Sequence, residues 1–203
     1  MLYLASQSPR RRHLLEQIGV PHTVLALGTE AEALEAQKPG EAPARYVRRV
    51  ARAKLAAALH ELQARGFAVA PVLCADTCVA LGQRIYGKPR DAHEAVQMLG
   101  ELAGREHTVL TAVALGLPDG TPPHEALSRS RVRFAPLSTA EIAAYVATGE
   151  PLDKAGAYAV QGRAATFIER ISGSYSGVMG LPLFETAALL RAAGTLPSPA
   201  EMV

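Results

Sequence analysis

The chain has 203 residues, a length typical of one domain and sufficient to bury a core without disulfides or a structural metal. Hydrophobic residues make up 49% and charged residues 20%, which excludes wholesale disorder. The net charge of +2 is too small for binding to nucleic acid by bulk charge, and an aromatic content of 5% disfavours a base-stacking surface for single strands.

Short apolar runs alternate with helical periods along the chain, which predicts an α/β fold with a mixed sheet. The predicted strands span 2–5, 23–27, 69–75, 108–117, 126–134 and 166–171, with a hairpin over 79–85. The predicted helices span 9–18, 43–65, 91–102, 139–147 and 183–193. Asp91 is the predicted N-cap of the helix 91–102, and Ser138 with Glu141 is the predicted capping box of the helix 139–147. We expect one domain over 1–194 and a frayed tail over 195–203.

The first residues are apolar and turn basic only at Arg10 to Arg12, the reverse of the order in a signal peptide. No apolar run reaches 18 residues, so the sequence predicts no membrane span. Two cysteines, Cys74 and Cys78, share one apolar segment and are too few for a four-cysteine zinc site. We therefore expect a soluble, cytoplasmic protein with reduced, buried thiols.

Three arginines, Arg10 to Arg12, occupy the first turn of the first predicted helix, where the helix dipole favours acids. Ser8 is placed to cap this helix and Pro9 to begin it. An anion such as a phosphate would explain the mismatch, because free N–H groups, the dipole and guanidinium groups all attract it. A solvated basic face is the alternative, and no Gly-x-x-x-x-Gly-Lys pattern indicates a Walker A loop.

The predicted helix 43–65 carries a lysine within its apolar stripe. Lys54 follows Val50 by four residues and Val47 by seven, so its ammonium group must either reach solvent or meet a buried anion. Four arginines of this helix fall mostly elsewhere and predict a solvated face: Arg45, Arg48, Arg49 and Arg52.

Asp76 follows the apolar run 69–75, and apolar residues resume after it. A carboxylate at the end of a strand, beside a basic cluster, suits a magnesium ligand or a general base, whereas the alternative is an Asx-turn that closes the strand. Lys88, which follows the hairpin, can approach the same cleft. The glycine-containing segments 149–162 and 172–180 lack helix or strand periodicity and predict loops that either approach a ligand or only connect elements.

Taken together, these segments resemble the Maf family of nucleoside triphosphate pyrophosphatases over nearly the whole chain, from residue 2 to about 190. The segments that carry the resemblance are 4–11, 46–56 with Lys54, 75–77, 87–89, 149–162 and 180–186. Within the family, the stretch 153–158 with Gln161 is similar to the branch that hydrolyses dTTP and UTP.

The resemblance implies an elongated α/β structure with flanking helices and a deep central cleft, related to the inosine triphosphatase-like fold and commonly a homodimer. It implies that Ser6, Arg10 and Arg11 bind phosphate and that Gln161 faces the base or ribose. It also implies catalytic roles for three residues, Lys54, Asp76 and Lys88.

The resemblance further implies a divalent metal, Mg²⁺ or Mn²⁺, held by Asp76 and a second acid. The family usually has adjacent acids after its second strand, whereas here Ala31 separates Glu30 from Glu32. The sequence does not choose between these two glutamates, nor does it say whether Asp76 is the base or only a metal ligand.

The expected reaction is hydrolysis of dTTP and UTP, and of modified pyrimidine nucleotides, to the monophosphate and pyrophosphate. Roles in cell-division arrest and in keeping modified nucleotides out of nucleic acid would follow from this activity. The alternatives are the same chemistry on 7-methyl-GTP and a non-enzymatic regulator of septum formation. A nucleic-acid-binding module that uses Arg10 to Arg12 is a weaker alternative, because charge and aromatic content are low.

Overall fold

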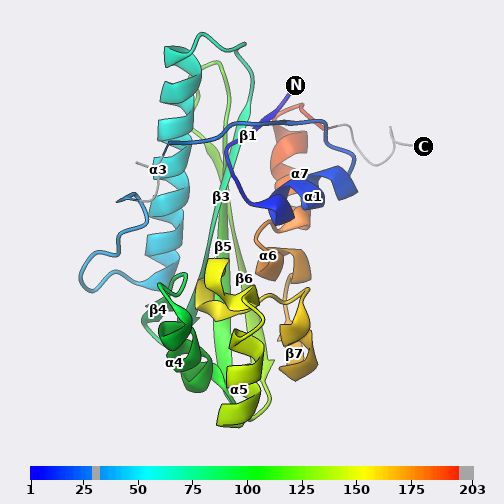
Figure 1. Ribbon diagram of the computed structural model, residues 1–203. Coiled ribbons are helices and arrows are strands. Elements are labelled where there is room, and N and C mark those ends of the chain that lie inside the picture. Colours follow the sequence, from blue (N-terminus) through cyan, green and yellow to red (C-terminus); the bar gives the residue numbers. More distant parts are fainter. Residues whose placement is uncertain (29–32, 197–203) are drawn as a thin grey trace.

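The computed structural model describes residues 1–28 and 33–196. In these residues seven strands form one sheet in the order β2-β1-β3-β5-β6-β7, and β4 pairs with β3 beside this path. β1 is parallel to β2 and β3, and all other pairs are antiparallel. The predicted mixed α/β fold is therefore confirmed (Figure 1).

The predicted strands and helices are all present, with ends that differ by a few residues. The strands are β1 (Tyr3–Leu4), β2 (Thr23–Val24), β3 (Val72–Leu81), β4 (Arg84–Tyr86), β5 (Glu106–Gly116), β6 (His124–Phe134) and β7 (Ile168–Ser172). The helices are α1 (Pro9–Gln17), α3 (Pro43–Ala64), α4 (Ala92–Leu102), α5 (Thr139–Val146), α6 (Tyr175–Met179) and α7 (Leu183–Ala192). Three short 3₁₀ helices follow α5: η1 (Glu150–Asp153), η2 (Ala155–Ala157) and η3 (Arg163–Phe167).

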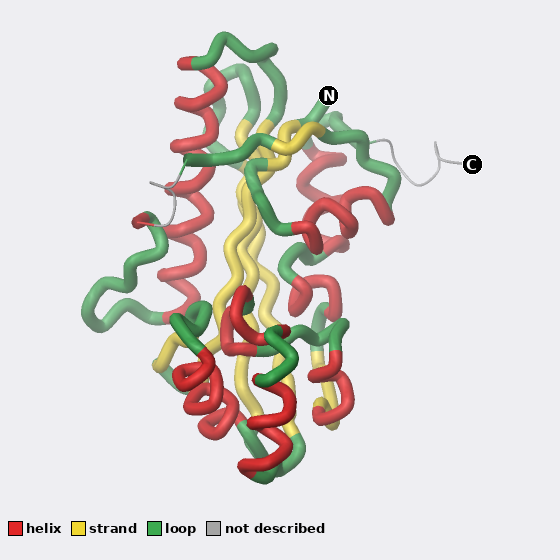
Figure 2. The backbone as a smooth tube through the Cα atoms, viewed as in Figure 1, coloured by secondary structure: helices red, strands yellow, loops and turns green. Residues whose placement is uncertain are grey.

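The long strands form the spine of an elongated molecule, and helices cover both of their faces (Figures 1 and 2). On one face lies α3, whose fully buried side chains include Val47, Val50 and Leu55. On the other face Leu14 and Leu15 of α1 pack in a second cluster, together with residues of α7. A third cluster joins α4 and α5 to the far end of β5 and β6. The apolar faces predicted from the helical period therefore cover the sheet.

The helix starts follow the sequence at two predicted positions. Asp91 caps α4 by accepting a hydrogen bond from Glu94 N at 2.8 Å. Ser138 and Glu141 form the predicted capping box at the start of α5. At α1 the prediction was only half right, because Ser8 occupies the N-cap position but its side chain makes no capping bond.

The structure corrects one predicted loop and one predicted strand end. The glycine- and serine-containing segment 172–180 holds a short helix, α6, because Ser174 Oγ accepts from Gly177 N at 2.9 Å and caps it. The strand predicted to end before Asp76 continues through it to Leu81. The prediction of a frayed tail falls mostly on 197–203, outside the described residues. None of the described helices combines the length and hydropathy of a membrane span.

One edge of β3 is left open in the described part of the chain, and this opening positions the site. β1 reaches only to Leu4, which lies opposite Leu73. β4 begins to pair with β3 only at Val79. Between these two points the chain leaves β1 toward α1 on one side and leaves β4 toward α4 on the other. A cleft therefore opens along the middle of β3, beyond the end of the parallel strand β1.

The third core cluster contains a buried histidine. His107 is 2% exposed, its Nε2 lies 2.9 Å from Tyr158 Oη, and its ring packs edge-on against Phe134 with centroids 4.8 Å apart. Among the described residues its Nδ1 has no hydrogen-bond partner. Burial lowers the pKa of His107 to about 4, so the ring is neutral at pH 7.

The lowered pKa of His107 predicts that the folded protein loses stability at acid pH. The folded-state pKa lies below that of the unfolded chain, so the stability that His107 contributes is complete above pH 6.5 and lost as the pH falls toward 4. The loss amounts to about 3 kcal/mol of unfolding free energy. Urea unfolding of His107→Gln between pH 7 and 4 should show a shallower decline than the wild type. The exposed His60 is the control, and a His107→Gln profile parallel to that of His60→Gln would contradict the assignment.

Candidate active site

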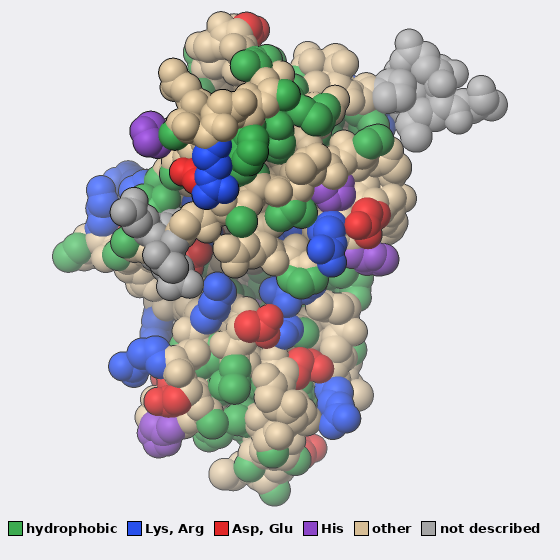
Figure 3. Space-filling model, turned by 45° about the horizontal axis from the view of Figure 1, so that its top comes forward, with side chains coloured by type: hydrophobic (Ala, Val, Ile, Leu, Met, Phe, Trp, Pro, Cys, Tyr) green, Lys and Arg blue, Asp and Glu red, His purple; other side chains and the backbone are tan. Residues whose placement is uncertain are grey.

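A cavity of about 550 Å³ occupies the cleft beside the open edge of β3. Basic side chains gather across the middle of this face of the molecule (Figure 3). The cavity brings together seven residues that the sequence predicts for the site: Ser6, Arg10, Arg11, Lys54, Asp76, Lys88 and Gln161. The predicted metal-binding acids Glu30 and Glu32 lie outside the described residues.

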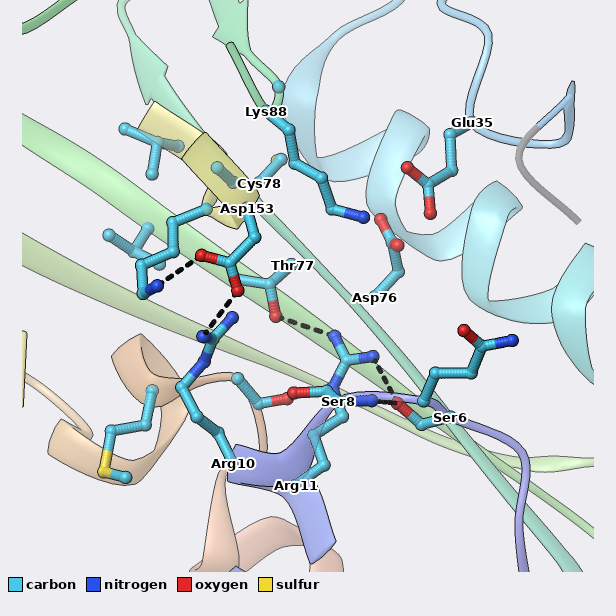
Figure 4. A pocket seen from close by; sticks show the side chains of 18 of the residues that line it. Ser6, Ser8, Arg10, Arg11, Glu35, Asp76, Thr77, Cys78, Lys88 and Asp153 are labelled. Atoms are coloured by element: carbon cyan, nitrogen blue, oxygen red, sulfur yellow. Dashed lines mark hydrogen bonds and ion pairs between the residues drawn. The ribbon is translucent and has the colours of Figure 1, made fainter. Parts of the chain in front are cut away.

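Two adjacent residues of β3 serve opposite sides of the cavity. Successive side chains of a strand point to opposite faces, so Asp76 points toward α3 and Thr77 toward α1. Asp76 is thus a residue of the strand interior, and neither the predicted strand end nor the alternative Asx-turn is present. The continuous strand fixes both side chains at the bottom of the cavity (Figure 4).

The ammonium group of Lys54 lies between two carboxylates. Lys54 Nζ is 2.7 Å from Asp76 Oδ1 and 2.6 Å from Glu35 Oε1. The side chain of Asp76 is 7% exposed, that of Lys54 12% and that of Glu35 35%. Of the two alternatives for a lysine in the apolar stripe, the structure therefore shows the buried anion.

The two carboxylates have different proton affinities. Burial raises the pKa of Asp76 and outweighs the opposing charges of Lys54 and Arg11. Burial also acts to raise the pKa of Glu35, but there the charges of Lys54, Lys88 and Arg11 outweigh it and the pKa is lowered. The charged form of Glu35 is therefore favoured, and Asp76 takes up a proton more readily than an ordinary aspartate.

Glu35 is a residue of the cavity that the sequence does not predict, because nothing in the local pattern separates this third acid from Glu30 and Glu32. Its position depends on α3. Tyr46 Oη donates to the carbonyl oxygen of Glu35 at 3.0 Å. Arg49 donates to the carbonyls on either side, at 3.2 Å to Leu34 and 2.9 Å to Ala36.

Arg49 also corrects the prediction of a solvated arginine face on α3. It is half-buried, and its Nε and Nη2 each donate to a Glu41 carboxylate oxygen at 2.7 Å. Arg45, Arg48 and Arg52 are exposed as predicted. Arg49 therefore fastens the segment that presents Glu35 to the cavity.

Arg11 is held by a network that crosses the cavity floor. Its Nε donates to the Gly180 carbonyl at 2.7 Å, its Nη1 to Ser6 Oγ at 3.2 Å and its Nη2 to Thr77 Oγ1 at 3.2 Å. Thr77 Oγ1 lies 2.9 Å from Thr111 Oγ1, which extends the network into β5. The guanidinium plane is thus fixed, with its remaining N–H groups available to an anion in the described part of the cavity.

The far wall of the cavity is formed by the segment after α5. Arg10 Nη1 lies 3.7 Å from Asp153 Oδ2, and Lys154 also pairs with Asp153. Gly156 N donates to the Gly87 carbonyl at 3.0 Å, next to Lys88. Gly156 has φ +70°, and a Cβ there would lie within 3.0 Å of Val79, so only glycine allows this close approach. The loop that carries Lys88 and the segment that carries Lys154 are therefore joined.

The charges of the cavity favour a polyanionic ligand with an uncharged end. In the described part of its wall, the cationic side chains are Arg10, Arg11, Lys54, Lys88 and Lys154, and the carboxylates are Glu35, Asp76 and Asp153. The wall also has an apolar stretch with Val109, Tyr158, Val160, Val178 and Met179, and Gln161 lies beside it. A phosphate chain suits the first region and a flat heterocycle the second.

Comparisons with known proteins agree with this description. The model of the family described as Maf-like protein matches residues 1–193. A relative from Burkholderia pseudomallei (strain 1710b) is 61% identical over 194 residues, which cover 95% of this chain and 93% of the relative. A relative from Albidiferax ferrireducens is 58% identical and covers 95% of this chain and 96% of its own length. A relative from Cupriavidus metallidurans is also 58% identical and covers 96% of this chain and 97% of its own length. All three are named dTTP/UTP pyrophosphatase.

Among solved structures, the Ham1 protein of Staphylococcus aureus is similar with a TM-score of 0.44 and 14% sequence identity. The similarity covers 66% of this chain and 71% of that chain.

The raised pKa of Asp76 predicts that this carboxylate opposes folding at neutral pH. A folded-state pKa above the unfolded value means that its favourable contribution exists at acid pH and is lost as the pH rises through the folded pKa. Asp76→Asn should therefore be at least as stable as the wild type at pH 7, with an advantage that shrinks toward pH 4. Thermal unfolding at both pH values measures this.

Asp119→Asn is the matched control, because Asp119 is exposed and hydrogen bonds from Thr121 lower its pKa. This variant should gain nothing at pH 7. A fall of several degrees in the melting temperature of Asp76→Asn at pH 7 would contradict the account.

Proposed function

This chain belongs to the family of Maf-like proteins, and from that premise we propose that it is a nucleoside triphosphate pyrophosphatase that hydrolyses dTTP and UTP to the monophosphate and pyrophosphate. The observation that carries the proposal is the Asp76–Lys54–Glu35 array at the bottom of a cavity rich in cations. The names of the relatives, which are about 60% identical, support the choice of substrates.

The barrier to this reaction is charge, because water must reach a phosphorus atom surrounded by anionic oxygens. Arg10, Arg11 and Lys88, which line the cavity, would bind the triphosphate and stabilise the charge that builds up on it. Arg11 is pre-oriented by Ser6 and Thr77, so it needs little rearrangement when substrate binds. Ser6 thus supports phosphate binding through Arg11.

Water activation falls to Asp76. Oδ2 of Asp76, the oxygen not bonded to Lys54, can accept the proton of the attacking water. Lys54 holds the other oxygen and keeps the carboxylate pointed into the cavity. Release of pyrophosphate from the α-phosphorus then leaves the nucleoside monophosphate.

The donor set fits a divalent metal. Mg²⁺ and Mn²⁺ prefer carboxylate oxygens and often bind through one or two of them together with substrate phosphates. Asp76 and Glu35, the two carboxylates that share Lys54, would hold such an ion. When bound, it would neutralise phosphate charge and lower the pKa of a coordinated water. That Glu30 or Glu32 is a further metal ligand stays a prediction from the sequence.

The base would occupy the apolar stretch of the wall, with Gln161 beside it. A side-chain amide can both donate to and accept from the edge of a pyrimidine.

The homodimer and the cytoplasmic location predicted from the sequence are part of the same proposal. Light scattering tests the former, and a mass equal to a single chain would contradict it.

The substrate assignment predicts a definite specificity. Pyrophosphate release from dTTP and UTP in the presence of Mg²⁺ or Mn²⁺ should exceed release from CTP, ITP, 7-methyl-GTP and the standard purine nucleotides, and a chelator should abolish it. Preference for 7-methyl-GTP would support the pyrophosphatase reaction but contradict the assignment to the dTTP and UTP branch of the family. No release by folded protein would favour a non-enzymatic nucleotide sensor.

The role of the Asp76–Lys54 pair predicts the effects of two substitutions. Asp76→Asn should lower kcat for dTTP by a factor of about a hundred or more, as expected for a key electrostatic group. Lys54→Ala should lower kcat while the protein remains folded. Activity of Asp76→Asn within a few-fold of wild type would exclude the proposed base, and unfolding of Lys54→Ala would make that lysine a structural residue.

A further inference from the structure

The segment 149–162 forms one wall of the cavity but has little regular structure of its own. Seven of its residues line the cavity: Asp153, Lys154, Ala155, Tyr158, Ala159, Val160 and Gln161. Its two short 3₁₀ turns and two consecutive residues of positive φ, Gly156 and Ala157, cannot by themselves fix where Gln161 lies. The position of this wall must therefore depend on contacts with its surroundings.

Glu150, at the beginning of the segment, joins its two ends. Oε1 accepts from Tyr145 Oη of α5 at 2.8 Å, and Oε2 accepts from Arg163 N at 3.1 Å. The same Tyr145 oxygen accepts from Ala159 N at 3.3 Å. One carboxylate and one hydroxyl group thus hold the backbone at 159 and 163, on both sides of Gln161.

The protonation of Tyr145 suits this double role. Burial raises the pKa of Tyr145, and the hydrogen bond to Glu150 raises it further, so the hydroxyl keeps its proton. The proton is donated to Glu150, and the lone pairs of the oxygen remain for Ala159 N.

Gly162 makes room for the carboxylate. A Cβ at position 162 would lie less than 3.0 Å from both oxygens of Glu150, closer than side chains approach. The backbone of Gly162 has negative φ, so an alanine there would not be strained by its own conformation and would instead displace the carboxylate of Glu150. Glu150 and Gly162 are thus a fitted pair.

We infer that Glu150 is a positioning residue for nucleobase recognition: together with Tyr145 and Gly162 it fastens the segment that presents Gln161 to the cavity. Glu150 does not line the cavity, so it acts through the wall and not by contact with substrate. The inference rests on the proposed function, since the recognition of a base requires a nucleotide substrate. It adds a determinant of specificity that lies outside the binding surface.

The first test is kinetic. Glu150→Ala should raise KM for dTTP and UTP by about tenfold to a hundredfold, the range expected when a charged hydrogen-bond partner is lost, while kcat falls by about threefold or less. The preference for dTTP over CTP should shrink in parallel. Glu150→Gln, which keeps one acceptor oxygen, should restore part of the effect. An unchanged KM, or a loss confined to kcat, would overturn the inference.

The second test uses the fit between Glu150 and Gly162. Gly162→Ala should raise KM in the wild type, because it displaces the carboxylate. In the Glu150→Ala background the same substitution should have almost no further effect, because the space is empty. Additive effects of the two substitutions would contradict the pairing. Glu169→Ala, which removes a surface carboxylate paired with Arg133, is the matched control and should leave KM unchanged.

The third test needs no nucleotide and separates this inference from the proposed function. Amide hydrogen exchange at 159–163 should be faster in Glu150→Ala and in Tyr145→Phe than in the wild type, with exchange in β3 and β5 unchanged. This result would support the fastening role even if dTTP and UTP were not hydrolysed. Unchanged exchange at 159–163 would overturn it, and exchange raised throughout the chain would assign Glu150 to overall stability instead.

Discussion

The ion pair between Lys54 and Asp76 is the constraint on which the site depends. A carboxylate in the interior of a strand, 7% exposed, needs a cation beside it to stay ionised. Lys54 reaches it from the apolar stripe of α3, so the packing of that helix on the sheet fixes the distance between the charges. The same ammonium group draws in Glu35, and the cavity thereby acquires two carboxylates of unlike proton affinity.

The sheet provides a place for this array by leaving an edge open. Because β1 ends at Leu4 and β4 begins to pair at Val79, the middle of β3 borders the cavity instead of another strand. The pleat then divides the chemistry between two sides. Asp76 faces α3 and the carboxylate array, while Thr77 faces α1 and holds Arg11. The proposed phosphate binding and water activation would thus depend on neighbouring residues of one strand.

Many features of the fold and of the candidate site could be predicted because they depend on residues that are close together in the sequence. The helical period of 43–65 predicts that Lys54 lies on the buried face. The conflict between the arginines of α1 and the helix dipole drew attention to the helix end that borders the cavity. Capping at Asp91 and Ser138 follows from side chains within one turn. The order of the segments that resemble the Maf family then predicted that these residues share one site.

Other features depend on contacts between distant segments and leave no local trace. The strand through Asp76 was predicted to end there, because a carboxylate within an apolar run is unfavourable until Lys54 is present. Glu35 is indistinguishable in sequence from its neighbouring acids, and Arg49 looked like one solvated arginine among four. Only the folded chain shows that Arg49 bonds the carbonyls beside Glu35.

The most direct test of this account is the single-turnover rate of dTTP hydrolysis by Glu35→Gln, measured with saturating Mg²⁺. Glutamine keeps the size of the side chain and an acceptor for Lys54 but removes the negative charge. If the two carboxylates around Lys54 form the catalytic centre, the rate should fall by a factor on the order of a hundred, with the fold intact. A rate within a few-fold of wild type would contradict it, and the second acid would then lie elsewhere in the chain.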